Sequence, residues 1–198
     1  MDIISIDIDG VLTRPLFYTP IVQKIKNLNR KYFFRHSYNK VEAIIMKILH
    51  YSEETIPGSI SALQDLHANS YRIMLNSSRP DFLQERTIKW VRKYKLETCV
   101  NAIKLRNVQK TPLESKLSYI RDNHIRIHLD DDPYTVEQIA KSPDLDYIFF
   151  INPTHKYEQM FQSVPHVICS KSVQDAVHAI IQINEGNKFV PKQHTYNN

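Results

Sequence analysis

Short apolar runs alternate with longer amphipathic stretches along the chain. The apolar runs are rich in Ile, Leu, Val and Phe and have the length of buried strands, whereas the stretches between them repeat apolar positions every three or four residues, as helices do. Six strands are expected, at 2–9, 71–75, 99–105, 125–129, 146–151 and 166–169. Strands that alternate with helices predict an α/β fold, here a Rossmann-like three-layer sandwich with a mostly parallel central sheet.

The segment between the first two expected strands carries helical patterns of its own. Thr19 and Pro20 are typical of an N-cap and a first helical residue. Apolar residues at helical spacing follow, first Ile21, Ile25, Leu28 and Tyr32, and then Val41, Ile44, Ile45, Ile48 and Leu49. We therefore expect a small helical cap at 14–55, inserted into a core domain formed by 1–13 and 56–185, with a polar tail at 186–198.

The later helices have recognisable ends. Amphipathic helices are expected at 80–95 and at about 112–123. Asp132 followed by Pro133 predicts a helix that Asp132 caps. Ser170 or Ser172 is expected to cap the last helix.

The amino-acid composition excludes several classes of protein. The chain has 198 residues and 42% apolar residues, which suits one domain with a small insertion. Its three glycines are too dispersed for a dinucleotide fingerprint or a P-loop. The net charge of +5 is interpreted as that of an ordinary, mildly basic protein, and electrostatic attraction of anionic substrates is the alternative interpretation. The chain contains no run of like charges of the kind that would indicate a nucleic-acid-binding arm.

The cysteines and the apolar runs indicate a location. Cys99 and Cys169 form no CxxC motif, so we expect two free thiols in a reducing compartment. The N-terminus begins at once with a strand pattern rather than a signal peptide, and no apolar run has the length to span a bilayer. These features predict a cytoplasmic protein without membrane contact.

Polar residues gather where expected strands end. Asp7-Ile8-Asp9-Gly10 ends the first strand, Ser77-Ser78-Arg79 follows the second, and Asp130-Asp131-Asp132 follows the fourth. In parallel sheets, ligands bind outside these carboxyl ends. Asp7 and Asp9 are two apart on an extended chain and are expected to face the same side. Gly10 permits a sharp turn that exposes backbone N–H groups to an anion.

Carboxylates that converge in this way repel one another unless a cation lies between them. Oxygen ligands alone favour Mg²⁺. Lys116, on the helix before the fourth strand, is expected to neutralise the remaining charge, and Ser77 to hydrogen-bond a phosphoryl oxygen. An aspartate can attack phosphorus directly. The pattern thus indicates a site for phosphoryl transfer.

These residues resemble the four motifs of the haloacid dehalogenase superfamily. Asp7-Ile8-Asp9-Gly10-Val11-Leu12 looks like the first motif, Ser77 the second, Lys116 the third, and Asp130-Asp131 the fourth. Their order and spacing match over about residues 1–185. The resemblance implies a Mg²⁺-dependent phosphatase that forms an aspartyl-phosphate.

The resemblance also implies a role for each residue. Asp7 would be the nucleophile and a metal ligand. Asp9 would be the general acid and then the base, and its backbone carbonyl would bind the metal. Asp131 would ligate Mg²⁺ directly and Asp130 through water. Asp132 is expected to be only a helix cap.

Several assignments stay open on the sequence. Lys104 and Lys110 compete with Lys116 as the site lysine, and Ser78 competes with Ser77. Arg79 is either a substrate-phosphate contact or a surface charge at a helix end. His124 and His128 are interpreted as structural histidines rather than as a zinc pair.

The substrate is expected to be a small phosphorylated molecule. The short helical cap and Ser77-Ser78-Arg79-Pro80 are similar to the 5′(3′)-deoxyribonucleotidases, and Ile151-Asn152 with the following Pro-Thr-His is loosely so, which makes nucleoside monophosphates the lead substrates. Aromatic residues near the cap either stack a base or fill its core, namely Phe17, Tyr18, Tyr32, Phe33 and Phe34. The alternatives are a phosphosugar phosphatase, a nucleic-acid 3′-end phosphatase and a non-catalytic binding protein. A receiver domain would place its adjacent acid pair at the first strand, not late in the chain. The sequence leaves the oligomeric state open.

Overall fold

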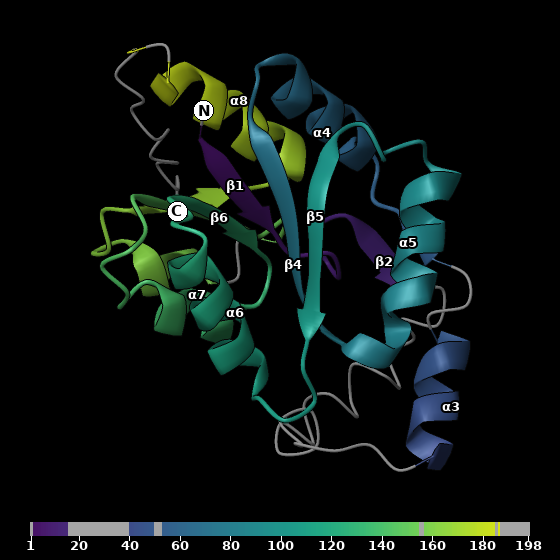
Figure 1. Ribbon diagram of the computed structural model, residues 1–198. Helices are drawn as coiled ribbons and strands as arrows, with labels where there is room; N and C mark the ends of the chain where they lie inside the picture. The colour runs from purple at the N-terminus through teal and green to yellow at the C-terminus, as the bar shows by residue number, and fades with distance from the viewer. Residues whose placement is uncertain (1, 16–39, 50–52, 155–156, 185, 187–198) are drawn as a thin grey trace.

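A six-stranded parallel sheet forms the centre of the computed structural model, which describes residues 2–15, 40–49, 53–154, 157–184 and 186 (Figure 1). The strand order across the sheet is β5-β4-β1-β6-β7-β8. The strands are β1 (Ile3–Ile6), β4 (Arg72–Pro80), β5 (Val100–Arg106), β6 (Ile127–Asp130), β7 (Tyr147–Ile151) and β8 (Val167–Ser170). Every pairing between these strands is parallel, so the predicted α/β sheet is confirmed.

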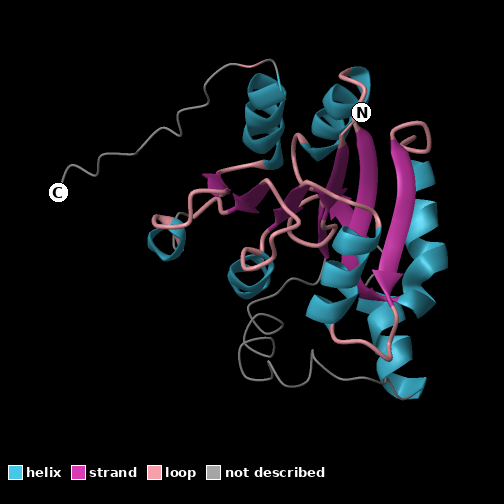
Figure 2. Cartoon of the chain, turned by 60° about the vertical axis from the view of Figure 1, so that its left-hand side comes forward, coloured by secondary structure: helices cyan, strands magenta, loops and turns pink. Residues whose placement is uncertain are grey.

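Helices cover both sides of the sheet (Figure 2). They are α4 (Ser59–Ala68), α5 (Gln84–Lys93), α6 (Pro112–Asp122), α7 (Pro133–Ile139) and α8 (Val173–Asn184), with short 3₁₀ turns η1 (Asp81–Leu83) and η2 (Glu158–Phe161). The expected helix at 80–95 is therefore a 3₁₀ turn followed by an α-helix. The sandwich has three layers, as predicted.

Alternation along the strands divides the core in two. In β4, Ile73 and Leu75 pack in one cluster with residues of α4, α5 and α8, whereas Met74 packs in the other with residues of α6 and α7. In β7, Phe149 belongs to the first of these clusters and Phe150 to the second. Because successive side chains of a strand leave on opposite faces, a strand covered on both faces is apolar throughout.

Local signals fix the helix starts. Asp132 caps α7, since its Oδ2 accepts a hydrogen bond from the amide of Thr135 at 2.8 Å. Ser172, rather than Ser170, is positioned at the start of α8, where its Oγ accepts from the amide of Asp175 at 3.1 Å. Both contacts satisfy amides that have no partner within the helix.

The strand β4 is longer than the expected strand at 71–75. It continues through Pro80 because Ser77 pairs with Leu105 and Pro80 with Arg106 of β5, with an irregular register between Ser77 and Pro80. Polar residues and a proline predict a loop by local propensity, but pairing with a neighbouring strand overrides that preference. The Ser77-Ser78-Arg79 segment is thus held on the sheet.

Part of the expected cap is described. α3 (Lys40–Leu49) corresponds to its second helix, and β2 (Thr13–Pro15) pairs antiparallel with β3 (Glu53–Thr55) at the base of the insertion. The first expected cap helix, the nearby aromatic residues and the tail from 187 lie outside the described residues. The domain division stays a prediction.

Strand order determines where a ligand site lies. From β1 the chain proceeds to β4 and β5 on one side and later to β6, β7 and β8 on the other. The order of the strands therefore reverses beside β1, and ligands of such sheets bind in the crevice at the carboxyl ends of the strands there. Asp7 follows β1 at this point, and its amide donates to the carbonyl of Leu129 at 2.9 Å.

Candidate active site

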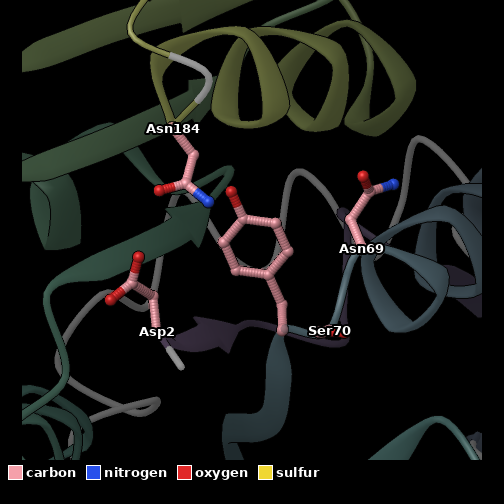
Figure 3. Close-up of a pocket in the computed structure, with 5 residues that line it drawn as sticks. Asp2, Asn69, Ser70 and Asn184 are labelled. Carbon is pink, nitrogen blue, oxygen red and sulfur yellow. The ribbon is translucent and has the colours of Figure 1, made fainter.

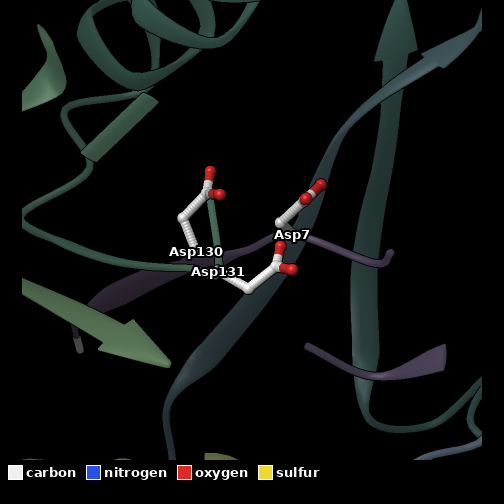
Figure 4. A group of neighbouring side chains, drawn as sticks. All are labelled: Asp7, Asp130 and Asp131. Carbon is white, nitrogen blue, oxygen red and sulfur yellow. The ribbon is translucent and has the colours of Figure 1, made fainter. Parts of the chain in front are cut away.

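Three aspartates meet at the carboxyl ends of β1 and β6. Asp7 follows β1, Asp130 ends β6 and Asp131 is next, and one oxygen of each lies within 4.8 Å of the others (Figure 4). Asp7 and Asp130 are buried and Asp131 is partly buried. The cluster offers only carboxylate oxygens, which a hard divalent cation prefers over nitrogen or sulfur ligands.

Lys116 is the lysine at this cluster. Its side chain is 2% exposed, and its ammonium pairs with Asp130 Oδ2 and lies 3.3 Å from Asp7 Oδ2. Of the two competitors, Lys110 is exposed and donates to Ser118, and Lys104 lies on β5 opposite Asn76 of β4. The Lys116 ammonium therefore faces two buried carboxylates, which leaves an excess of negative charge in the cluster.

The Asp7 carboxylate is the less satisfied of these two. Its Oδ1 is buried, and no donor among the described residues reaches it. Burial raises the pKa of Asp7 to about 7, and the carboxylates of Asp130 and Asp9 add to the rise while Lys116 opposes it. A buried oxygen without a donor, surrounded by like charges, is a position that a cation fits.

Asp130 is held by several donors. Its Oδ2 accepts from Lys116 and from His128 Nε2 at 3.1 Å, and its Oδ1 accepts from the amide of Asp132 at 3.0 Å. Burial alone would raise the pKa of Asp130, but Lys116 and His128 outweigh it and hold the pKa well below its ordinary value. Asp130 is therefore ionised and fixed in orientation. That Asp131 ligates the metal directly and Asp130 through water stays a prediction.

His128 is a residue that the sequence pattern does not assign to the site. It is fully buried, and burial lowers its pKa, so the ring is neutral. Because Asp130 can only accept, Nε2 carries the proton, and Nδ1 accepts from Ser5 Oγ at 3.0 Å. Ser5 on β1 precedes Asp7 by two residues, and His128 precedes Asp130 by two on the neighbouring β6. Alternation therefore gives a signal for the Ser5–His128 pair once the two strands are known to be neighbours.

Gly10 makes room for Asp131. Its φ of +88° is a conformation that residues with a side chain rarely adopt, and a Cβ there would lie 1.9 Å from Asp131 Oδ2. Its own amide donates to the carbonyl of Thr13 at 2.9 Å and so is already engaged within the loop. The expected exposure of N–H groups to an anion does not apply to the Gly10 amide in this structure.

Replacing Gly10 by Ala is expected to displace Asp131 and to weaken Mg²⁺ binding by about tenfold or more, as loss of a supporting contact at a metal site does. Titration calorimetry with MgCl₂ measures the change. Gly58→Ala is the matched control, because Gly58 has a similar φ of +81° but the atoms nearest to its Cβ would be those of the exposed side chain of Gln174. Equal Mg²⁺ affinity in the two variants would contradict the assignment of Gly10.

Asp9 belongs to a second, adjacent cluster. Arg79 Nε donates to its Oδ2 at 2.9 Å and Arg79 Nη2 to its Oδ1 at 2.8 Å. Asp7 and Asp9 therefore have different partners, but they are close enough for the Asp9 carboxylate to contribute to the raised pKa of Asp7. The extended geometry ends directly after them, in a turn where the amide of Gly10 donates to the carbonyl of Thr13. That the two side chains face the same side stays a prediction.

Arg79 is buried at 3% exposure, so the expectation of a surface charge at a helix end is wrong. Its Nη2 also donates to Glu53 Oε2 at 2.7 Å and to Thr13 Oγ1 at 3.1 Å. Glu53 lies on β3, and no local pattern in the sequence indicates that it reaches the site. Only the packing of the insertion's base against β4 brings these residues together.

The two serines differ in burial. Ser77 is buried and its Oγ accepts from the amide of Arg79 at 3.3 Å, which leaves the hydroxyl proton to donate. Ser78 is partly buried, and its carbonyl accepts from Arg106 Nε at 3.2 Å. Which serine contacts a phosphoryl group stays a prediction, with the geometry favouring Ser77.

A hollow of about 450 Å³ lies elsewhere in the molecule. Its lining residues are Asp2, Asn69, Ser70, Tyr71 and Asn184, which lie at the amino ends of β1 and β4 and at the end of α8 (Figure 3). The clustered carboxylates are at the opposite edge of the sheet. The aspartate cluster is therefore not part of this pocket.

Comparison with known proteins shows likeness in fold. No protein-family model matches the chain, and no curated protein is similar to it in sequence at a significant level. A haloacid dehalogenase-like family protein from Streptococcus pneumoniae matches with a TM-score of 0.63 and 12% identity, over 92% of this chain and 99% of that one. D,D-heptose 1,7-bisphosphate phosphatase from B. bronchiseptica, complexed with magnesium and phosphate, matches with a TM-score of 0.58 and 11% identity, over 92% and 99%.

A phosphatase of the same superfamily from Thermococcus onnurineus matches with a TM-score of 0.53 and 14% identity, over 96% of this chain and all of that one (100%). The chain therefore has the haloacid dehalogenase-like fold, and the resemblance drawn from the four motifs is confirmed at the level of the fold. Within the part of the chain that the structure describes, no helix combines the length and apolar character needed to cross a bilayer.

Proposed function

We propose that the chain is a Mg²⁺-dependent phosphomonoester hydrolase that acts through an aspartyl-phosphate on Asp7. The observation that carries this proposal is the buried Asp7 carboxylate, with one oxygen lacking a donor among the described residues, beside Lys116 and two further aspartates. Asp7, Asp131 and Asp130 would hold Mg²⁺, which would supply positive charge to the phosphoryl oxygens.

The reaction divides into two displacements. An oxygen of Asp7 bonds to phosphorus while the ester bond breaks, and Asp9 gives its proton to the departing alcohol oxygen. Asp9 then takes a proton from water as the water oxygen attacks phosphorus, and the bond from phosphorus to Asp7 breaks to release inorganic phosphate. Lys116 keeps Asp7 and Asp130 compensated, and the Ser77 hydroxyl donates to a phosphoryl oxygen.

Nucleoside monophosphates are the proposed substrates. The support is the similarity of Ser77-Ser78-Arg79-Pro80 to the nucleotidases, with the insertion at 14–55 proposed to select the substrate. A sugar phosphate is the second candidate, and the heptose bisphosphate phosphatase of the same fold favours it. The proposal includes a cytoplasmic location, where the free thiols of Cys99 and Cys169 stay reduced.

A substrate panel tests the proposal. Purified protein is given nucleoside monophosphates, sugar phosphates and a 3′-phosphorylated oligonucleotide, each with MgCl₂ or with EDTA, and released phosphate is measured. We expect Mg²⁺-dependent release, fastest from a nucleoside monophosphate. Release from sugar phosphates alone would move the assignment to the second candidate. No release from any member of the panel would overturn the hydrolase proposal and favour a binding role.

A further inference from the structure

The guanidinium of Arg79 contacts residues from four parts of the fold. It binds both oxygens of Asp9, which lies in the turn after β1, and it also bonds Glu53 on β3, Thr13 on β2 and, at 3.4 Å, Thr87 on α5. The side chains of Arg79 and Glu53 are nearly fully buried, and that of Asp9 is partly exposed. We call Arg79, Asp9 and Glu53 the Arg79 cluster.

The cluster holds Asp9 away from the role that the proposed function gives it. A carboxylate whose two oxygens both accept from a guanidinium fork is ionised and fixed. To protonate a departing alcohol, Asp9 has to release at least one of these bonds, take up a proton from solvent water and present the protonated oxygen to the ester. The structure therefore shows a resting arrangement of Asp9.

Glu53 provides a carboxylate partner for Arg79 when Asp9 moves away. A buried guanidinium that loses its only carboxylate is strongly destabilised, because an uncompensated charge stays in a low-dielectric environment. With Glu53 2.7 Å from Nη2, Arg79 still faces a carboxylate after Asp9 leaves. Glu53 and Asp9 share Nη2, which donates to both, so the negative charge of Glu53 repels that of Asp9 across this nitrogen.

We propose that Arg79 and Glu53 are positioning residues. Arg79 binds the Asp9 carboxylate in a resting position, and Glu53 determines how readily Asp9 is released from Arg79 to reach the leaving-group oxygen of the ester. This inference rests on the proposed function. Arg79 is thereby assigned to Asp9 rather than to the substrate phosphate, because its Nε and Nη2 groups donate to side chains of the protein and it is buried.

Leaving-group dependence tests the inference. Cleavage of glycerol phosphate needs a proton donor, whereas cleavage of p-nitrophenyl phosphate does not, because nitrophenolate leaves as a stable anion. In Glu53→Gln the repelling charge is lost and Asp9 is held more firmly. Under single-turnover conditions with MgCl₂, we expect glycerol release to slow roughly tenfold, within the range that a general acid contributes, and nitrophenolate release to change less than about twofold.

The controls separate this role from a structural one. Glu54→Gln removes the neighbouring charge, but Glu54 is exposed, so both rates should stay as in the wild type. Glu53→Asp keeps the carboxylate and should restore part of the glycerol rate, and it also serves as the test variant if Glu53→Gln does not fold by circular dichroism. If Glu53→Gln slows the release of both leaving groups by the same factor, or slows neither, the positioning role is wrong. The same holds for Glu53→Asp only where it replaces Glu53→Gln as the test variant. A wild type that cleaves neither of these substrates nor any member of the panel would overturn the proposed function instead.

Discussion

The variant Asp7→Asn is expected to lose phosphate release while keeping its fold. Asparagine has nearly the same shape but lacks the carboxylate oxygen that bonds to phosphorus, and loss of a nucleophile lowers turnover by at least about 10⁴-fold. Phosphate release from the best substrate of the panel measures the effect. Asp2→Asn, which changes an exposed residue before the same strand, is the control and should retain full activity.

The same variant is expected to be more stable than the wild type without metal at pH 8. Burial raises the pKa of Asp7 to about 7 from an ordinary value of 3.8. An acid whose pKa is raised in the folded state binds more protons there than in the unfolded chain. The contribution of Asp7 to the stability of the wild type therefore falls as pH rises from about 4 to about 7. Asparagine does not titrate and avoids this loss.

Urea unfolding at several pH values measures the difference. The free energy of unfolding of Asp7→Asn should exceed that of the wild type at pH 8, and the two should converge toward pH 4. Added MgCl₂ should stabilise the wild type more than the variant, because the cation binds the ionised carboxylate only in the folded state. A variant that is less stable than the wild type at pH 8 in EDTA would show that Asp7 is not the strained charge of the cluster.

The residues at the strand ends could be predicted because they depend on local pattern. Apolar runs mark the strands, and the polar residues directly after them belong to one edge of a parallel sheet. Asp7, Asp130 and Asp131 follow this rule and lie together in the structure. Lys116 required one further step, since it lies on a helix, but it precedes its partner Asp130 on β6 by only 14 residues.

The contacts between distant segments could not be predicted. Ser5 and His128 are 123 residues apart and meet because β1 and β6 are neighbours, which follows from strand order rather than from either local pattern. Glu53 and Arg79 meet because the base of the insertion packs on the end of β4. Local propensity also misplaced the end of β4, where pairing with β5 extends a strand through residues that favour a loop.

The variant Lys116→Met is expected to be the most destabilised of those considered. Methionine retains a chain of similar length but removes the ammonium that contacts both Asp7 and Asp130. Removing one partner of a buried ion pair costs about 3–5 kcal/mol, because the charge that remains is uncompensated. We expect a loss of that size in the free energy of unfolding at pH 8, together with loss of phosphate release.

The loss should depend on pH in a defined direction. In the wild type, Lys116 and His128 hold the pKa of Asp130 below its ordinary value. Without Lys116, burial dominates and both carboxylates acquire pKa values above those of the unfolded chain, so the variant regains stability as pH falls and these groups take up protons. Urea unfolding at pH 5 and pH 8 should therefore show a smaller deficit at pH 5.

Lys110→Met makes the same substitution at a lysine that the sequence leaves as a competitor for the role. Lys110 is exposed and its ammonium donates a surface hydrogen bond to Ser118, so its replacement should change the free energy of unfolding by less than about 0.5 kcal/mol at either pH. Equal deficits in the two variants, or a Lys116→Met deficit that does not shrink at pH 5, would contradict the assignment of Lys116. The expected contrast follows because a charge contributes strongly to stability only where water cannot replace its partner.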